Sequence, residues 1–231
     1  MNDESSSQNR PQLPEHFRER HRKWLSKLGI LDRPWLIFGS SPSPTLPPEL
    51  LKTHARVDVN NSGRTAQMLG LGPADLTVRK KHKPWSEHPT MQTRGLLWYH
   101  TEPLFLMRLR LLMMPRVRVG RLMRASRMER DTIVELVAGA SPRETGNTGK
   151  ATNGVCALCY ALYVGVPEVV LSGISVSKNG HSYNERNKAR MQVSEDRFIL
   201  GILKDRPNIF TTEDDLAEDV GIKLWKAPES A

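Results

Sequence analysis

Cysteine is scarce in this chain. Among its 231 residues, only Cys156 and Cys159 are cysteines, so the sequence does not describe a disulfide-stabilised fold. Their CxxC spacing could serve a redox pair or half of a zinc site, but no second CxxC or histidine pair is present to complete the zinc site. Both lie in an apolar stretch with helical spacing. We therefore expect core thiols and a reducing cytoplasm.

Long apolar runs are also missing. No stretch approaches the roughly 18 apolar residues of a membrane-spanning helix, and the first 24 residues lack the apolar segment of a secretion signal. We expect a cytoplasmic protein, with peripheral attachment at the inner membrane as an alternative. Residues 1–14 are predicted to be a disordered lead. The length suits one α/β domain, predicted over 15–231.

The common nucleotide-binding motifs do not occur. No GxGxxG follows the first predicted strand and GxxxxGK[ST] is absent, so neither a dinucleotide site nor a P-loop is predicted. No Asp-x-Asp stands at the end of a predicted strand. Its absence is consistent with chemistry that needs no divalent ion.

Acidic residues are few in the middle of the chain. The net charge is +9, and from Arg79 to Arg130 there are 13 Lys or Arg against only Glu87, Glu102 and Glu129. This block favours anionic partners, such as a nucleotide phosphate, an acidic saccharide or an acidic membrane surface, although it could also be a solvated helix face. Nucleic acid is not favoured, because few aromatic residues are interleaved with the charges.

Strand and helix patterns alternate along the chain. Strands are predicted at 35–41, 55–63, 74–83, 94–101, 167–173, 208–212 and 222–225, and helices at 15–30, 153–164, 194–206 and 212–221. The turn at 41–51 is predicted to lead into a brief helix. The range 102–139 is predicted to be helical with breaks at Pro115 and Gly120, and 85–145 as a whole to be a basic helical insertion or lid. The alternation predicts an α/β, Rossmann-like, doubly wound and mostly parallel sheet.

Small and amide residues follow three predicted strands. They let backbone N–H groups approach a phosphate, and their hydroxyls and carboxamides can bind a base or ribose. The nucleotide-binding candidates at these strand ends are Gly39, Ser40, Ser41, Ser43, Asn60, Asn61 and Gly173.

A polar turn precedes the helix predicted at 153–164. Thr152 or Asn153 can cap this helix, whose first N–H groups would point at a bound phosphate, and Lys150 would add a positive charge. Lys150, Thr152, Asn153 and Gly154 are therefore further nucleotide-binding candidates. An ordinary capped helix is the alternative.

The segment "SVSKNGHSYNER" follows the strand predicted at 167–173. It contains His181, Tyr183 and Glu185, which we select as catalytic candidates. A histidine near a carboxylate can act as a general base, and a tyrosine hydroxyl can donate to a leaving phosphate. A polar surface loop is the alternative.

Together, "ATNGVCALCYALYVGVPEVVLSGISVSKNGHSY" resembles the nucleotide-sugar segment of bacterial sialyltransferases of glycosyltransferase family 42. In that family a Thr-Ser-Gly-Val turn starts a helix, a strand close to "YLSGIDF" follows, and an Asn-Gly turn leads to a tyrosine. The register holds without a gap from Thr152 to Tyr183. "IFGSSPS", "VDVNNSG" and "GIKLW" are similar to other family strands, so the resemblance covers about half the chain.

The resemblance implies a Rossmann-like domain of the GT-A variant type that binds a CMP-sugar as donor substrate, without a metal site and without a cofactor. It places Ser40 and Asn61 at the family's loop and nucleotide-binding asparagines. Thr152, Asn153 and Gly154 fall on its phosphate- and cytidine-contacting turn, and Tyr183 on one of two tyrosines that serve the leaving phosphate.

Three positions depart from the family pattern. Ser177 occupies the other tyrosine position, Asn153 replaces a serine, and Met191 lies near the position of the catalytic histidine. His181, or a carboxylate such as Glu185, would then have to be the base. The resulting hypothesis is an inverting, metal-independent glycosyltransferase that moves a sialic or related ulosonic acid from a CMP-sugar to a glycan or glycolipid acceptor.

Two alternatives remain at this stage. One is another nucleotide-dependent enzyme of the same fold, of the pyrophosphokinase-like kind. The other is a non-catalytic basic protein that binds an acidic polymer or membrane surface.

Overall fold

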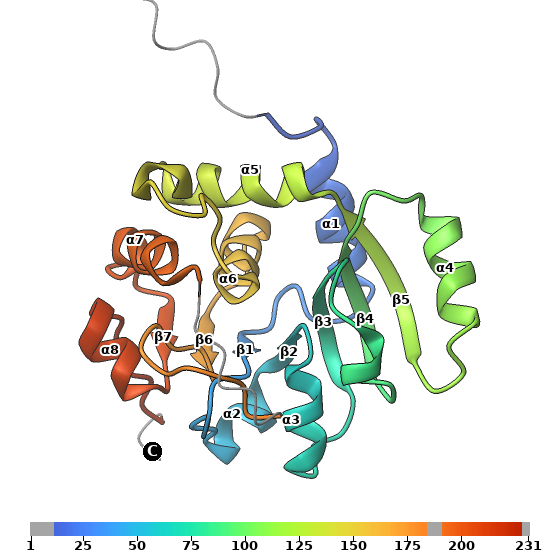
Figure 1. Ribbon diagram of the computed structural model, residues 1–231, viewed down its shortest axis with the longest axis horizontal. Coiled ribbons are helices and arrows are strands. Elements are labelled where there is room, and N and C mark those ends of the chain that lie inside the picture. The colour runs from blue at the N-terminus through green and yellow to red at the C-terminus, as the bar shows by residue number, and fades with distance from the viewer. Residues whose placement is uncertain (1–11, 184–190, 228–231) are drawn as a thin grey trace, which may run out of the picture.

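The protein is built on one sheet of seven parallel strands (Figure 1). The computed structural model describes residues 12–183 and 191–227. The strands are β1 (Trp35–Phe38), β2 (Ala55–Val59), β3 (Ala74–Lys80), β4 (Gln92–Tyr99), β5 (Arg118–Ala125), β6 (Val169–Ser172) and β7 (Ile209–Thr211). The predicted fold class, an α/β doubly wound Rossmann-like sheet, is confirmed.

The strand order places a switch point at the first strand. The sheet runs β5-β4-β3-β2-β1-β6-β7, so the chain builds outward from β1 to β5 and then returns to the other side of β1. β1 pairs in parallel with both β2 and β6. In open α/β sheets the loops at the carboxyl ends of the strands diverge at such a point, which makes it the usual ligand site.

Helices cover both faces of the sheet. They are α1 (Phe17–Ser26), α2 (Pro48–Thr53), α3 (Ser62–Met68), α4 (Leu104–Leu112), α5 (Arg127–Ala138), α6 (Asn153–Val164), α7 (Val193–Leu203) and α8 (Asp214–Val220). Two short 3-10 turns, η1 (Trp85–Glu87) and η2 (Pro142–Thr145), complete the elements. α6 lies over the middle of the sheet with α1, α5 and α7 around it, while α2 and α3 lie across the sheet from them (Figure 1).

The burial of β1 explains its apolar sequence. Its four residues are all fully buried, and they alternate between two cores. Trp35 and Ile37 belong to the main core beneath α6, whereas Leu36 packs with Leu50 of α2 and Val170 on the opposite face. A strand covered on both faces is apolar throughout and does not alternate with polar residues.

The helix that carries both cysteines forms as expected, from Asn153 to Val164. It ends at Gly165, which has a positive φ of 84° and so suits the left-handed end of a helix. Both thiols are free and buried, and burial raises the pKa of Cys156 to about 12. The prediction that the cysteines are core thiols is confirmed.

The prediction of a basic helical insertion or lid over 85–145 is wrong. This range supplies β4 and β5, the last two strands at one edge of the sheet, together with α4 and α5. The error came from reading 102–139 as helical. Val117 and Val119 alternate with Arg116 and Arg118, a two-residue period typical of a half-exposed strand, and this signal identifies β5.

Two smaller differences concern short elements. α3 begins within the strand predicted at 55–63 and continues into a stretch for which no element was predicted. The predicted strand at 222–225 contributes only a single parallel bridge, from Leu224 to Thr211. The predicted disordered lead, 1–14, falls mostly outside the described residues. Within the described ranges, no helix is long and apolar enough to cross a membrane.

His21 makes the fold sensitive to acid. Its ring is fully buried, stacks on Phe17 and lies 2.9 Å from the Tyr160 hydroxyl through Nδ1. Burial, with the nearby charge of Arg20, lowers the pKa of His21 to about 3 from its ordinary value of 6.5. Between these two pKa values, the unfolded chain binds a proton at His21 and the folded chain does not. The resulting loss of unfolding free energy is negligible well above pH 6.5 and grows as the pH falls toward 3.

We expect this histidine alone to remove about 2 kcal/mol of stability between pH 7 and pH 5. His21→Gln should flatten the pH dependence of the unfolding free energy over that interval, measured by urea denaturation. His16→Gln is the control, because the His16 side chain is 80% exposed. Equal slopes for wild type and His21→Gln would contradict this origin of the acid sensitivity.

Candidate functional site

Two glycines join the strand ends at the switch point. Gly39 N–H donates to the Ser172 carbonyl at 2.7 Å, and Ser41 N–H donates to the Gly173 carbonyl at 2.8 Å. A Cβ on Gly39 would lie 2.2 Å from the Gly173 carbonyl oxygen, so only glycine fits there. The need for small residues at 39 and 173 is thus explained by backbone packing. Because the two backbones touch, the loops after β1 and β6 run side by side.

His181 reaches the loop after β1. Ser182 N–H donates to the Ser40 carbonyl at 2.9 Å, and the Ser40 hydroxyl lies 3.0 Å from His181 Nδ1. The His181 ring stacks on the ring of Tyr183, with centroids 5.1 Å apart and an interplanar angle of 7°. The structure therefore brings together three candidates from two distant segments. The third catalytic candidate, Glu185, lies outside the described residues.

Tyr183 is buried at this junction. Burial, and then the nearby Glu87 carboxylate, raises the pKa of Tyr183, while hydrogen bonding to Asn61 and the charge of Arg79 partly offset the rise. The phenol is consequently protonated at neutral pH. A protonated phenol can donate a hydrogen bond to an anionic oxygen.

The Asn61 carboxamide is held from two sides. Arg79 donates to its Oδ1 at 2.6 Å, and its Nδ2 donates to Glu87 at 2.5 Å. The Arg79 guanidinium also donates to two backbone carbonyls of the loop after β3 and lies 4.1 Å from the centroid of the Trp85 ring. Burial lowers the pKa of Arg79 to about 10, so it remains charged at neutral pH.

Arg79 and Glu87 are not among the site residues predicted from the sequence. In the sequence, Arg79 stands out only as the first residue of the basic block. Its position at the carboxyl end of β3 was the available signal, because that end lies beside the carboxyl end of β2 in a parallel sheet. Glu87 gave no comparable signal, since only the fold of the intervening loop brings it to Asn61.

The start of α6 meets the end of β2. Asn153 Nδ2 donates to Asn60 Oδ1 at 2.7 Å, and the same oxygen accepts the Lys80 N–H at 3.1 Å. Asn60 has a positive φ of 56°, a left-handed conformation that asparagine tolerates better than most residues. Gly154 is packed closely, since a Cβ there would lie 3.0 Å from Ile174. Asn60 and Asn153 are thus in direct contact, and Gly154 is the next residue in the chain.

Positive charge gathers beside this contact. Burial lowers the pKa of Lys80, and the charges of Arg130, Arg127 and Lys150 lower it further. Lys80 therefore lies near three other cations. Arg130 is partly neutralised by Asp131 at 2.5 Å, and Arg127 lies 3.7 Å from the same carboxylate. Lys80 and Lys150 supply positive charge next to the N-terminus of α6, where an anion would be favoured.

The turn before α6 is less open than expected. Thr152 N–H donates to Asp196 at 2.7 Å, and Gly149 N–H donates to Glu195 at 2.8 Å. Both carboxylates belong to the first turn of α7. Thr152 holds the N-cap position, but its side chain makes no capping hydrogen bond. The Thr152 N–H is therefore engaged within the chain.

Two further serine candidates, Ser41 and Ser43, differ from Ser40 in their surroundings. Ser41 is fully buried, and its hydroxyl has no hydrogen-bond partner among the described residues. Ser43 is exposed, with a positive φ of 50°. Glu213 joins the loop that contains Ser43 to the end of β6, because its carboxylate accepts both the Thr45 and the Gly173 N–H groups. The structure thus gives these two serines surroundings that differ from those of Ser40.

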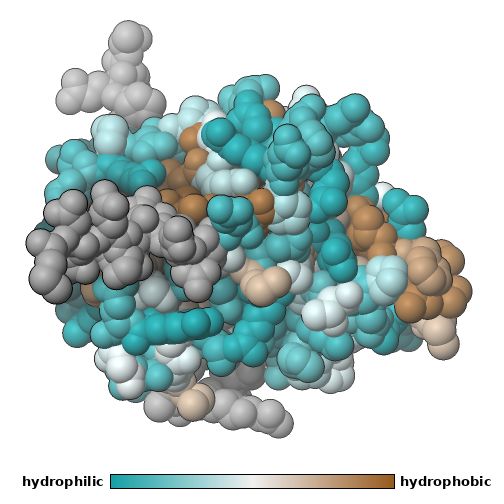
Figure 2. Space-filling model, turned by 90° about the horizontal axis from the view of Figure 1, so that it is seen from above, coloured by the Kyte–Doolittle hydropathy of each residue, from teal (hydrophilic) through white to brown (hydrophobic). Residues whose placement is uncertain are grey.

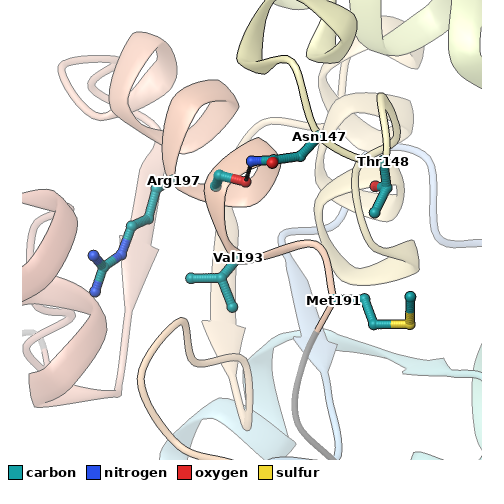
Figure 3. Close-up of a pocket in the computed structure, with 6 residues that line it drawn as sticks. Asn147, Thr148, Met191, Val193 and Arg197 are labelled. Atoms are coloured by element: carbon teal, nitrogen blue, oxygen red, sulfur yellow. Dashed lines mark hydrogen bonds between the residues drawn. The ribbon is translucent and has the colours of Figure 1, made fainter.

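A cavity of about 610 Å³ is lined by none of the site residues predicted from the sequence. Its lining comes from the loop before α6, from the residue two positions before α7 and from the first turns of α7. The lining residues are Asn147, Thr148, Met191, Val193, Ser194 and Arg197 (Figure 3). Asn147 bridges the two segments through a 2.6 Å hydrogen bond to Ser194. Met191 is 81% exposed here. The cavity therefore adjoins the turn that carries Thr152.

Comparison with known proteins gives little beyond this geometry. No protein-family model matches the chain, and no curated protein matches it. Among solved structures, the chain is similar to the sialyltransferase CstII from Campylobacter jejuni, determined in complex with the substrate analogue CMP-3FNeuAc. The match has 14% identity and a TM-score of 0.49, and it covers 83% of this chain and 86% of that one. A likeness at this level assigns neither a reaction nor a substrate.

The buried Arg79 should be essential for stability. Arg79→Met would leave the Asn61 and Glu87 side chains without their cation, and we expect a loss of roughly 3 kcal/mol in unfolding free energy. Arg197→Met is the matched control, because its ion pair with Asp219 is at the surface, where such a pair contributes about 1 kcal/mol or less. Urea denaturation measures both. Losses of similar size would show that Arg79 does not organise the site.

Proposed function

We propose that the protein is a glycosyltransferase that moves a sialic or related ulosonic acid from a CMP-sugar to a glycan or glycolipid acceptor. One observation supports this most strongly. Asn153 at the start of α6 bonds to Asn60 after β2, so the turn that resembles a nucleotide-sugar turn lies against the loop that would hold the nucleotide. Asn61 and Tyr183 lie at the same junction.

The proposed reaction is a direct displacement at the anomeric carbon. The bond from that carbon to the CMP phosphate oxygen breaks, and the acceptor hydroxyl oxygen forms the new glycosidic bond. The hydroxyl proton passes to a base, and CMP leaves with both electrons of the broken bond. A single displacement inverts the configuration at the anomeric carbon.

The chain offers groups that suit the charge on the leaving phosphate. Lys80 and Lys150 lie beside the N-terminus of α6, and the protonated Tyr183 phenol can donate a hydrogen bond. Fixed positive charge and donors at a developing anion are a large source of rate enhancement. In this proposal they take the place of a metal ion.

His181 is the proposed base. Its Nδ1 lies 3.0 Å from the Ser40 hydroxyl, and its ring is oriented by stacking on Tyr183. A neutral imidazole held in this way can accept the acceptor's proton. Glu185 follows within four residues and is the alternative base.

The first test concerns the nucleotide. We expect millimolar CMP to raise the melting temperature by several degrees, because a ligand that binds only the folded state stabilises it. UDP and GDP are the controls and should have little effect. Asn153→Ala should reduce the shift given by CMP, since it removes the side chain that joins α6 to Asn60.

Equal shifts from all three nucleotides would point to another nucleotide-dependent enzyme of this fold. If no nucleotide shifts the melting temperature, the proposal fails and a non-catalytic role is favoured.

The second test separates binding from chemistry. His181→Ala should lower kcat for sugar transfer by roughly 100-fold to 10,000-fold, the usual contribution of a general base, while CMP still shifts the melting temperature nearly as in wild type. His16→Ala, at an exposed position in the N-terminal region, should leave both properties unchanged. Full turnover in His181→Ala would assign the base to another residue, with Glu185→Gln as the next variant.

A further inference from the structure

α4 is apolar on two sides. Toward the sheet, Met107 is fully buried, and the half-buried Leu104 and Leu111 pack around it. They contact a small core that includes Trp98 and Leu122 from β4 and β5. A surface helix needs only one apolar face to pack against a sheet. This contact accounts for one side of α4 and leaves the other side unexplained.

The opposite side exposes large hydrophobic residues. Phe105 is 67% exposed, Leu109 56%, Leu112 80% and Met113 78%. Their spacing of four, three and one residues places them along one side of the helix and its C-terminal end. Figure 2 shows hydrophobic side chains gathered at the right-hand end of the molecule, the end at which Figure 1 places α4.

The segment that holds α4 and β5 is rich in arginine. Residues 103–128 contain no Asp or Glu, and their charged residues are Arg108, Arg110, Arg116, Arg118, Arg121, Arg124 and Arg127. Arg108, Arg116, Arg118 and Arg121 are exposed. β5 is the edge strand of the sheet and packs with α4 on the same small core. Strand alternation puts Arg118 on the face that carries α4 and Arg121 on the other face. We call Phe105, Leu109, Leu112 and Met113, together with Arg108, Arg116 and Arg118, the α4 surface.

The charge selects the partner. A second copy of the chain placed against this surface would bring two sets of arginines together, and like charges without compensation oppose association. An anionic lipid bilayer complements both features. Phenylalanine, leucine and methionine side chains can enter the boundary between headgroups and acyl chains, while arginines bind the phosphate groups above it.

The size of α4 agrees with binding on a membrane and not through it. α4 has nine residues, and no helix in the described part of the chain is long and apolar enough to span a bilayer. Interfacial helices lie in the membrane plane with the apolar side down and basic residues at the headgroups. α4 has this arrangement on a folded support.

We propose that the α4 surface binds the protein peripherally to anionic lipid membranes. The inference is independent of nucleotide binding, because none of its residues belongs to the cluster around Asn60 and Asn153. It also gives the basic block a physical role: the arginines of the α4 surface face the lipid, whereas Arg79 is buried inside the protein.

Co-sedimentation of the full chain with vesicles tests this proposal. We expect binding to vesicles of phosphatidylglycerol and phosphatidylcholine, and much weaker binding to phosphatidylcholine alone. Arg116→Glu should lower the partition coefficient about tenfold, because it reverses one charge at the anionic surface. Lys52→Glu, at an exposed position on α2, is the matched control and should change binding little.

The apolar contribution is tested separately. Phe105→Ser combined with Leu112→Ser should lower the partition coefficient at least about tenfold, since it removes two side chains from the acyl boundary. Ile202→Ser is the control, because Ile202 of α7 is 42% exposed elsewhere on the molecule. All these positions are exposed, so the melting temperatures should remain near that of wild type.

Three outcomes would overturn the proposal. Equal binding to neutral and anionic vesicles would remove the role of the arginines. Vesicle binding that survives the double serine variant would place the contact elsewhere. A concentration-dependent dimer in size-exclusion chromatography that disappears in the double variant, without any vesicle binding, would assign the surface to a second copy of the chain.

Discussion

The close contact between Gly39 and Gly173 is the constraint on which the site depends. The two backbones touch where the chain changes direction in the sheet, with Gly39 N–H bonded to the Ser172 carbonyl at 2.7 Å. A side chain at residue 39 would force the loops after β1 and β6 apart. With glycine there, Ser40 can bond to the loop that contains His181 and Tyr183.

A buried cation fixes the second half of the site. Removing a guanidinium from water is costly, and Arg79 is stabilised by two backbone carbonyls, the Asn61 oxygen and the face of Trp85. In return, the Asn61 carboxamide has a single orientation, because its oxygen accepts from Arg79 and its nitrogen donates to Glu87. The asparagine at the end of β2 is thus positioned by a strand and a loop that follow it in the sequence.

Local pattern predicted some elements well and failed at others for identifiable reasons. The apolar stretch from Val155 onward, bounded by a polar turn and Gly165, defines α6 because every boundary signal is local. β5 was misjudged because leucines and methionines near α4 suggested a continuous helix, whereas pairing with β4 favours the extended chain. Likewise, the carboxylates of α7 that bind the turn before α6 could not be assigned from sequence. The two hydrogen bonds span 44 and 46 positions of the chain.

The sequence by itself determined the class of fold, the bounds of α6, the core position of both cysteines and the strand ends at which polar candidates lie. These features depend on periodicity, burial and turn chemistry, which act over a few residues. Tertiary structure decided which candidates meet: Asn153 with Asn60, His181 with Ser40, and Arg79 with Asn61. It also decided that α4 has an exposed apolar side. Those outcomes follow from strand order and long-range packing, which no local pattern encodes.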